Sequence, residues 1–248
     1  MTRTRTLALG IAGLLLSATA CAEPSDGAGE PAGHSGLSTV LFLGDSIAAG
    51  EALPLAAAFK AAGVGFTSIA SDGGGNVVGP FSDKNWEKLP EKIGAAKPSV
   101  LIYQSTTYDW GSPQEQQAGY EKLVTTAAHA GAKTLFVTFP PIRPDDFYQP
   151  HMTELNHTPE VARTVAAGSH GQAGALDAST VWGPAYQPTK DGKPDRSADG
   201  IHTCPQGAAR FTQWLLTELA KQYPGFQPPA PDTWANAGWS ADQRFQGC

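Results

Sequence analysis

The spacing of apolar and polar residues divides most of the chain into short strands and longer helices. Five runs rich in β-branched and aromatic residues are predicted as strands, at residues 40–43, 66–70, 100–104, 134–139 and 175–177. Helical stretches separate these runs, which is typical of parallel βαβ units. With 248 residues, the chain is long enough for one large α/β domain, which we expect to span residues 39–222.

Two of the helices are predicted by their first residues as well as by their apolar period. Ser112 and Glu115 form a capping box, with Pro113 at the first helical position. The apolar positions that follow are Tyr120, Leu123, Val124 and Ala127. Thr203 and Gln206 predict a similar capping box for the last helix, which ends before residues 223–225.

Prolines interrupt two further predicted helices and are frequent in the C-terminal tail. Residues 51–62 and 85–95 have helical patterns that Pro54 and Pro90 interrupt. The tail at residues 223–248 is too rich in proline for regular structure, yet it holds several aromatic residues: Phe226, Trp234, Trp239 and Phe245. We expect these rings to pack on the domain, and a disordered tail is the alternative.

The N-terminus has the pattern of an export signal. Arg3 and Arg5 precede an apolar run at residues 7–20 that is too short to span a bilayer comfortably, so residues 1–20 are predicted as a signal peptide. The signal ends in a sequence that resembles a bacterial lipoprotein cleavage box, which makes Cys21 the expected lipidated N-terminus. The alternative is ordinary cleavage at Ala20 or Ala22. Residues 21–38 are predicted as a flexible tether to the outer face of the cell membrane.

Charge and composition exclude several classes of protein. The chain carries 17 basic and 23 acidic residues, a net charge of −6, and no stripe of Lys or Arg, which argues against binding of nucleic acid. His151 and His157 lack the spacing of metal ligands and are predicted as loop residues. We therefore expect no metal and no cofactor.

Three cysteines in an exported protein leave one without a partner. If Cys21 carries the lipid, Cys204 and Cys248 are free to form a disulfide. Closing a loop of about 45 residues stabilises a fold by roughly 4 kcal/mol in the chain-entropy model. The bridge would also tie the C-terminal tail to the segment that carries His202.

Two short motifs carry the candidate chemistry. Ser46, in the triplet Gly44-Asp45-Ser46, directly follows the first predicted strand, which places its hydroxyl at the carboxyl edge of a parallel sheet. Asp199 and His202 stand just before the last helix, at a spacing that lets the carboxylate orient the imidazole. Either motif alone is weak evidence, but their order and their positions at opposite ends of the domain make the combination specific.

These motifs resemble those of the GDSL or SGNH hydrolase family over residues 39–222, with Ile47 in place of the usual Leu. The resemblance implies a flavodoxin-like three-layer α/β/α fold with a five-stranded parallel sheet. It also implies that Ser46 is the nucleophile, His202 the general base and Asp199 the orienting acid.

The family resemblance further implies an oxyanion hole with three donors. The first is the Ser46 N–H, and the second is a glycine within residues 73–75, for which we choose Gly74. The third is an asparagine in the family, but Tyr108 stands at that position and Thr106 at the preceding glycine. The phenol of Tyr108 or the hydroxyls of Thr106 and Thr107 are candidate replacements, or this donor is absent.

The sequence thus predicts an exported serine esterase that forms an acyl-enzyme intermediate on acyl or acetyl esters. Small-molecule esters, lipids and acetylated glycans all remain possible substrates, and an O-acyltransferase would use the same residues. A non-catalytic surface lipoprotein that binds glycans, or has a structural role, is the alternative from another class. The segment 139–144 after the fourth strand either lines the substrate cleft or forms a structural turn.

Overall fold

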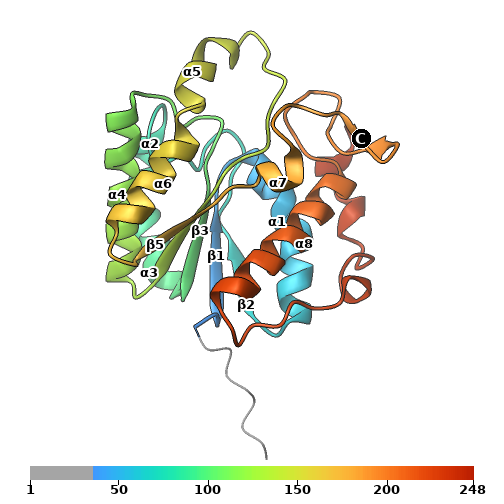
Figure 1. The fold of residues 1–248 in the computed structure, drawn as a ribbon, viewed down its shortest axis with the longest axis horizontal. Helices are drawn as coiled ribbons and strands as arrows, with labels where there is room; N and C mark the ends of the chain where they lie inside the picture. Colours follow the sequence, from blue (N-terminus) through green and yellow to red (C-terminus); the bar gives the residue numbers. More distant parts are fainter. Residues whose placement is uncertain (1–35) are drawn as a thin grey trace, which may run out of the picture. The chain divides into compact units, whose positions relative to one another are not determined.

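The computed structural model describes residues 36–248, which are built around a five-stranded parallel sheet (Figure 1). The strands are β1 (Thr39–Leu43), β2 (Gly65–Ser68), β3 (Val100–Gln104), β4 (Lys133–Val137) and β5 (Ala173–Leu176). Their order in the sheet is β2-β1-β3-β4-β5, and every pair is parallel. This is the flavodoxin-like order, so the predicted fold class is confirmed.

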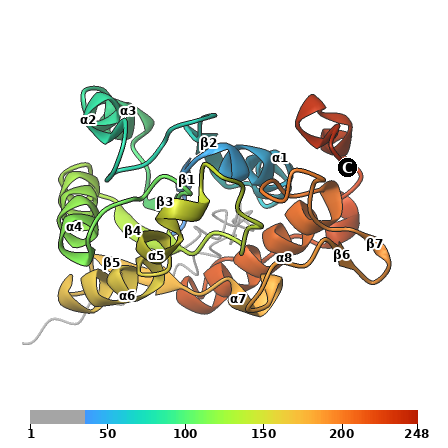
Figure 2. The same cartoon turned by 90° about the horizontal axis from the view of Figure 1, so that it is seen from above.

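Helices cover both faces of the sheet (Figure 2). They are α1 (Ser46–Ala61), α2 (Ser82–Trp86), α3 (Leu89–Ala96), α4 (Pro113–His129), α5 (Met152–Leu155), α6 (Thr158–Gly168), α7 (Ser179–Trp182) and α8 (Pro205–Gln222). Residues alternate in direction along a strand, so Val40 and Phe42 of β1 pack in the core under α1 and α8, while Leu41 and Leu43 pack in the opposite core under α3, α4 and α6. The sheet is therefore buried on both faces.

Several helix ends differ from the prediction. Helix α1 begins at Ser46, five residues before the predicted start, and continues through Pro54. Most residues of α1 are buried, and this packing outweighs the roughly 3 kcal/mol that an interior proline costs. The predicted helix at residues 85–95 is two helices, α2 and α3. Pro90 lies in the first turn of α3, where its missing N–H breaks no helical hydrogen bond.

The capping box predicted for the last helix is wrong. Cys204 is the N-cap residue of α8 and makes no side-chain capping bond. The Gln206 amide instead donates to the Lys190 carbonyl, 2.7 Å away. Lys190 belongs to a short hairpin that the sequence analysis missed, formed by β6 (Thr189–Lys190) and β7 (Lys193–Pro194). The turn between them, Asp191-Gly192, has positive φ at both residues, as a type I′ hairpin turn requires.

The ends of the predicted domain are packed more extensively than expected. Leu37, within the predicted tether, is fully buried in the core under α1 and α8. The tail forms three short 3₁₀ turns, η2 (Pro231–Thr233), η3 (Trp239–Ala241) and η4 (Gln243–Phe245), while a fourth, η1 (Gln149–His151), precedes α5. The tail side chains buried in the structure are Phe226, Trp234 and Phe245.

Two findings concern the predicted export features. The expected signal at residues 1–20, Cys21 and residues 22–35 of the tether lie outside the described residues. Among residues 36–248, the helices are too short or too polar to cross a membrane.

The structure contains the expected disulfide between Cys204 and Cys248, whose Cα atoms are 5.6 Å apart. The last residues also pair with the loop before α8, because the Ala198 N–H donates to the Gly247 carbonyl at 3.1 Å. The tail is thus fixed beside the loop that holds His202 by one covalent bond and one backbone hydrogen bond.

Replacing Cys248 by serine is expected to lower the free energy of unfolding by about 2–4 kcal/mol, because the unfolded chain loses a cross-link that closes a long loop. For a domain of this size the thermal midpoint should fall by roughly 5–15 °C, measured by differential scanning calorimetry. Position 248 is the better choice because Cys248 is exposed, whereas Cys204 is fully buried. The matched control is the intact mass of the wild-type domain after alkylation without reduction. Two alkylated thiols there would show that the disulfide is absent.

Candidate active site

Ser46 is the first residue of α1 and follows the carboxyl end of β1. The preceding residue, Asp45, is buried and caps the helix, because its carboxylate accepts the Ile47 N–H at 2.9 Å. The same carboxylate accepts both the N–H and the hydroxyl of Thr107, each at 2.8 Å. Burial raises the pKa of Asp45, and the bonds from Thr107 and Ile47 oppose that rise. Asp45 therefore joins the turn that carries Ser46 to the loop after β3.

Ser46, His202 and Asp199 form a continuous chain of hydrogen bonds. The Ser46 Oγ lies 2.7 Å from His202 Nε2, although the two residues are 156 positions apart. His202 Nδ1 lies 2.8 Å from Asp199 Oδ2, and Asp199 Oδ1 accepts the N–H groups of Ile201 and His202. Partial burial raises the pKa of Asp199, but the hydrogen bond from the His202 side chain and the two from the backbone lower it to about 2. The carboxylate is thus ionised at neutral pH and holds the proton of the imidazole on Nδ1.

Two arginines hold the loop that carries His202. The buried Arg196 donates to the carbonyls of three residues, Pro141, Ile201 and His202. Gly200 has φ +83° and packs against Arg143, so a Cβ there would lie 2.9 Å from the Arg143 Cβ. Only glycine fits this conformation and this approach. The sequence motif contains Gly200 but gave no sign of Arg196.

Ser46 and His202 line a pocket of about 350 Å³. Its other lining residues are Ile47, Gly50, Asp72, Gly73, Tyr108, Tyr148, Thr203 and Arg244.

The three consecutive glycines after β2 have different surroundings. Gly73 lines the pocket, whereas a Cβ on Gly74 would face the side chains of Ser71 and Asn85. Gly75 has φ +82° and lies so close to Gly44 that a Cβ would stand 1.9 Å from the Gly44 carbonyl oxygen. Gly73, rather than our choice of Gly74, is therefore the glycine that lines the pocket with Ser46.

The loop after β3 gives different surroundings to the three residues that the sequence analysis offers as a third donor. Thr106 and Thr107 are buried, and their hydroxyl protons are already donated to Asp109 and Asp45. Tyr108 lines the pocket, and the Tyr148 hydroxyl donates to its phenol oxygen at 3.2 Å. Burial and the hydrogen bond with Tyr148 raise the pKa of Tyr108 above its ordinary value, so its phenol keeps a proton at neutral pH. Of the three candidates, only Tyr108 has its side chain in the pocket.

The sequence analysis missed Arg244, which the C-terminal tail brings to the pocket wall. Its guanidinium donates to both carboxylate oxygens of Asp72, at 2.5 and 3.3 Å. The bond from Arg244 lowers the pKa of Asp72. One signal existed, because Arg244 stands four residues before Cys248, and the predicted disulfide brings that region close to His202.

The segment at residues 139–144 lines a different cavity. Phe139, Pro141 and Ile142 border a space of about 530 Å³ at the ends of β4 and β5, and neither Ser46 nor His202 lines it. Ile142 belongs to a small apolar cluster that also contains Ile47, Tyr148 and Ile201.

His151 and His157, the two histidines that the sequence analysis predicts as loop residues, lie among structural contacts. His151 is the last residue of η1 rather than a loop residue, and its ring stacks on Trp110 with 3.5 Å between ring centres. His157 directly precedes α6. Among residues 36–248, no group of three or more His, Cys, Asp or Glu side chains is arranged to hold a metal ion.

Comparison with known proteins places the fold. No protein-family model matches the chain, and no curated protein matches it in sequence. Solved structures do match: TesA, with 20% identity and a TM-score of 0.52, covers 74% of this chain and 99% of its own. A GDSL-like lipase from Bacteroides thetaiotaomicron has 14% identity and a TM-score of 0.55, covering 75% of this chain and 89% of its own.

A third structure is that of an acetylxylan esterase from Geobacillus stearothermophilus, a catalytic mutant. It has 13% identity and a TM-score of 0.54, and it covers 73% of this chain and 94% of its own. At these identities the likeness concerns the fold. The chain has the fold of GDSL/SGNH hydrolases, as its two motifs predict.

Proposed function

We propose that this protein is a serine esterase that hydrolyses acyl or acetyl esters through a covalent acyl-enzyme. The observation that carries the proposal is the chain of hydrogen bonds from Ser46 through His202 to Asp199, at the edge of an open pocket. A serine hydroxyl is a weak nucleophile until a positioned base takes its proton, and this arrangement supplies that base. The esterases and lipases among the proteins of similar fold support the same reaction.

In the first half of the proposed reaction, Ser46 Oγ attacks the ester carbonyl carbon while His202 Nε2 takes the hydroxyl proton. The resulting imidazolium is stabilised by the Asp199 carboxylate, 2.8 Å from Nδ1. The tetrahedral intermediate collapses, and His202 returns the proton to the leaving alcohol as the C–O bond breaks. Water then repeats these steps on the acyl-enzyme, which releases the carboxylic acid and restores Ser46.

The negative charge on the carbonyl oxygen needs donors that are already in place. We assign this role to the N–H groups of Ser46 and Gly73 and to the phenol of Tyr108. Ser46 begins a helix, so its N–H has no partner in the preceding turn, and the helix dipole adds favourable charge. Gly73 and Tyr108 line the same pocket.

The function is tested with a fluorophosphonate probe and an ester series. The wild-type protein should be labelled at Ser46 and should hydrolyse 4-nitrophenyl esters, with a chain-length series showing which acyl groups it accepts. If the folded protein neither reacts with the probe nor hydrolyses any ester, the non-catalytic binding module becomes the better proposal. Product analysis in the presence of a sugar acceptor distinguishes hydrolysis from acyl transfer.

Tyr108→Phe is expected to lower kcat about 10–100-fold with little change in KM. This loss is somewhat smaller than the 10²–10³-fold decrease in kcat that follows removal of one donor from an oxyanion hole. The reason is that phenylalanine keeps the ring in the pocket wall and removes only the donor. The matched control is Tyr148→Phe, which removes the hydroxyl bonded to Tyr108 but not Tyr108's own proton. Equal kcat in Tyr108→Phe and the wild type would exclude the phenol as a donor.

We further propose that the protein is exported and held at the outer face of the cell membrane by a lipid on Cys21. The basic and apolar pattern of residues 1–20 and the disulfide between Cys204 and Cys248 support an oxidising compartment. Cell fractionation of a Cys21→Ala variant tests the anchor. Release of the variant into the soluble fraction supports it, and an unchanged distribution contradicts it.

A further inference from the structure

Two exposed aromatic rings stand beside the pocket that holds Ser46. Among residues 36–248, Phe81 and Phe147 are the exposed large hydrophobic side chains, at 58% and 51% of their full accessible surface. Each packs edge-on against Tyr108, with 6.2 Å between ring centres. Since Tyr108 lines the pocket, the exposed rings continue the pocket wall onto the surface.

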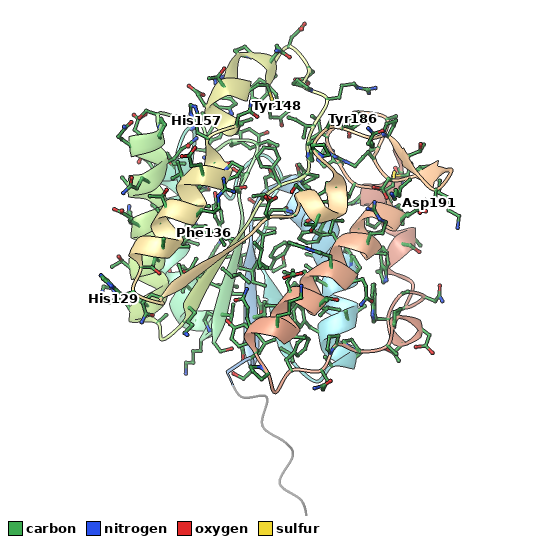
Figure 3. The ribbon with its side chains drawn as sticks, in the orientation of Figure 1. His129, Phe136, Tyr148, His157, Tyr186 and Asp191 are labelled. Atoms are coloured by element: carbon green, nitrogen blue, oxygen red, sulfur yellow. A yellow bond between two sulfur atoms is a disulfide. The ribbon has the colours of Figure 1, made fainter. Side chains whose placement is uncertain are left out.

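Trp110 and Tyr148 complete a group that we call the aromatic platform: Phe81, Tyr108, Trp110, Phe147 and Tyr148. Trp110 lies 5.9 Å from Tyr108 and 5.4 Å from Phe147, between ring centres. The five rings come from three segments that follow different strands of the sheet. Figure 3 shows Tyr148 beyond the carboxyl ends of the strands, at the edge where Ser46 begins α1.

The backbone at Phe81 is held in an unfavourable conformation. Phe81 has φ +67°, in the left-handed region that a bulky residue rarely adopts. The loop before it is fixed by the buried side chain of Asn76, which donates to the carbonyls of Val78 and Pro80. The exposed ring of Phe81 contributes little burial energy to offset this backbone strain. Strained residues and exposed apolar side chains are both typical of ligand sites.

The pocket chemistry indicates the kind of ligand. Ile47 is the aliphatic residue in the lining of the Ser46 pocket, and its side chain is fully buried, so this pocket offers little aliphatic surface to a long acyl chain. The lining also includes the Asp72–Arg244 ion pair, which offers hydrogen-bond acceptors and donors. A ligand that fits both the aromatic rings and this ion pair has a short acyl group, an apolar face and hydroxyl groups along its edge. A sugar ring has these properties.

We propose that the aromatic platform binds a sugar ring next to the scissile ester, so that the substrate is an O-acetylated oligosaccharide with its acetyl group at Ser46. This inference rests on the proposed esterase function and specifies its substrate class. The rings of Phe81 and Phe147 stack on the C–H faces of the sugar, while Asp72 and Arg244 hydrogen-bond its hydroxyl groups. The acetyl group is transferred to Ser46 Oγ, and the sugar leaves as the alcohol.

The test compares two esters in the double variant Phe81→Leu/Phe147→Leu. Leucine keeps apolar surface but removes the flat ring, so the variant separates stacking from simple hydrophobic contact. We expect kcat/KM for chemically acetylated xylohexaose to fall about tenfold, mostly through KM, as for the loss of a well-buried ring contact. Hydrolysis of ethyl acetate, followed by pH-stat, should stay within about twofold, because its ethyl group is too small to stack on Phe81 and Phe147 and the double variant keeps Tyr108.

A second variant excludes misfolding as the cause. Phe81→Gly relieves the positive φ, so its thermal midpoint should not fall, while its kcat/KM for the acetylated oligosaccharide should fall as in the leucine variant. Unchanged kcat/KM in the double leucine variant overturns the proposal. So does a wild type that prefers 4-nitrophenyl octanoate to 4-nitrophenyl acetate, two esters with the same leaving group.

Binding measured without turnover separates this inference from the proposed function. Calorimetric titration of acetylated xylohexaose into Ser46→Ala should show binding that weakens about tenfold when both phenylalanines are also replaced by leucine. If that result is found but the wild type is not labelled by the fluorophosphonate, the platform binds sugar and the esterase proposal fails. If the wild type is labelled but the leucine substitutions do not weaken binding, only the platform proposal fails.

Discussion

Ser46→Ala is expected to lower kcat for ester hydrolysis by about 10⁴–10⁶, the range found when a serine nucleophile is removed from a hydrogen-bonded triad. The variant keeps His202 and the backbone donors, but no atom remains that can form the acyl-enzyme. Residual activity should match water attack assisted by the oxyanion hole. The measurement is steady-state hydrolysis of 4-nitrophenyl acetate, together with loss of fluorophosphonate labelling.

The same position offers a clean control for folding. Asp45, not Ser46, supplies the side chain that caps α1, so alanine at 46 leaves the cap and the Thr107 contacts intact, and the thermal midpoint should be unchanged. Because Ser46 and His202 act as a unit, the double variant Ser46→Ala/His202→Ala should be no slower than Ser46→Ala alone. Activity of Ser46→Ala above about 1% of the wild type would contradict the assignment, because it exceeds the residual rate of a disabled triad.

Asp199→Asn is expected to lower kcat by about 10³–10⁴, close to the loss that an amide causes at the acid position of a serine triad. The structure explains why the amide is harmful. Asp199 Oδ1 accepts two backbone N–H groups, so the carboxamide oxygen of asparagine takes that place and its NH₂ group points at His202 Nδ1. The imidazole then keeps its proton on Nε2 and can no longer accept one from Ser46. The measurement is kcat for an activated ester.

Asp199→Ala is the matched control, because it removes the carboxylate without placing a donor against Nδ1. Both atoms of this pair lie in partly exposed side chains, so water can reach Nδ1 in the alanine variant. We therefore expect Asp199→Ala to be at least as active as Asp199→Asn. An asparagine variant with near wild-type kcat would show that Asp199 does not set the tautomer of His202.

Much of the fold could be predicted because its signals are local. β3 runs over the predicted residues, and the predicted capping box of Ser112 and Glu115 is present at the start of α4. The misses occur where packing overrides local preference. Helix α1 passes through Pro54 because most of its residues are buried, and α8 begins without the predicted box because Gln206 binds the hairpin instead.

The candidate site likewise contains some residues that local motifs identify and others that only the packing of the domain could place. The two motifs identified Ser46, Asp199 and His202, and the structure shows that hydrogen bonds connect their side chains. The choice among three adjacent glycines could not be made from sequence, because it depends on which of them packs against Gly44 and which faces the pocket. Likewise, Thr106 and Thr107 resembled free donors until their burial and their bonds to Asp109 and Asp45 were known.

By itself, the sequence determined the order along the chain of the five strands in the parallel sheet, the presence of α1, α4 and α8, and the chemical types at the proposed nucleophile and base positions. Periodicity, caps and motifs act over a few residues, so a single chain displays them directly. Only the tertiary structure decided that Arg244 reaches the pocket, that Arg196 holds the His202 loop and that Phe81 and Phe147 flank Tyr108. These contacts join residues distant in the chain, and the packing of the whole domain, rather than any local pattern, brings them together.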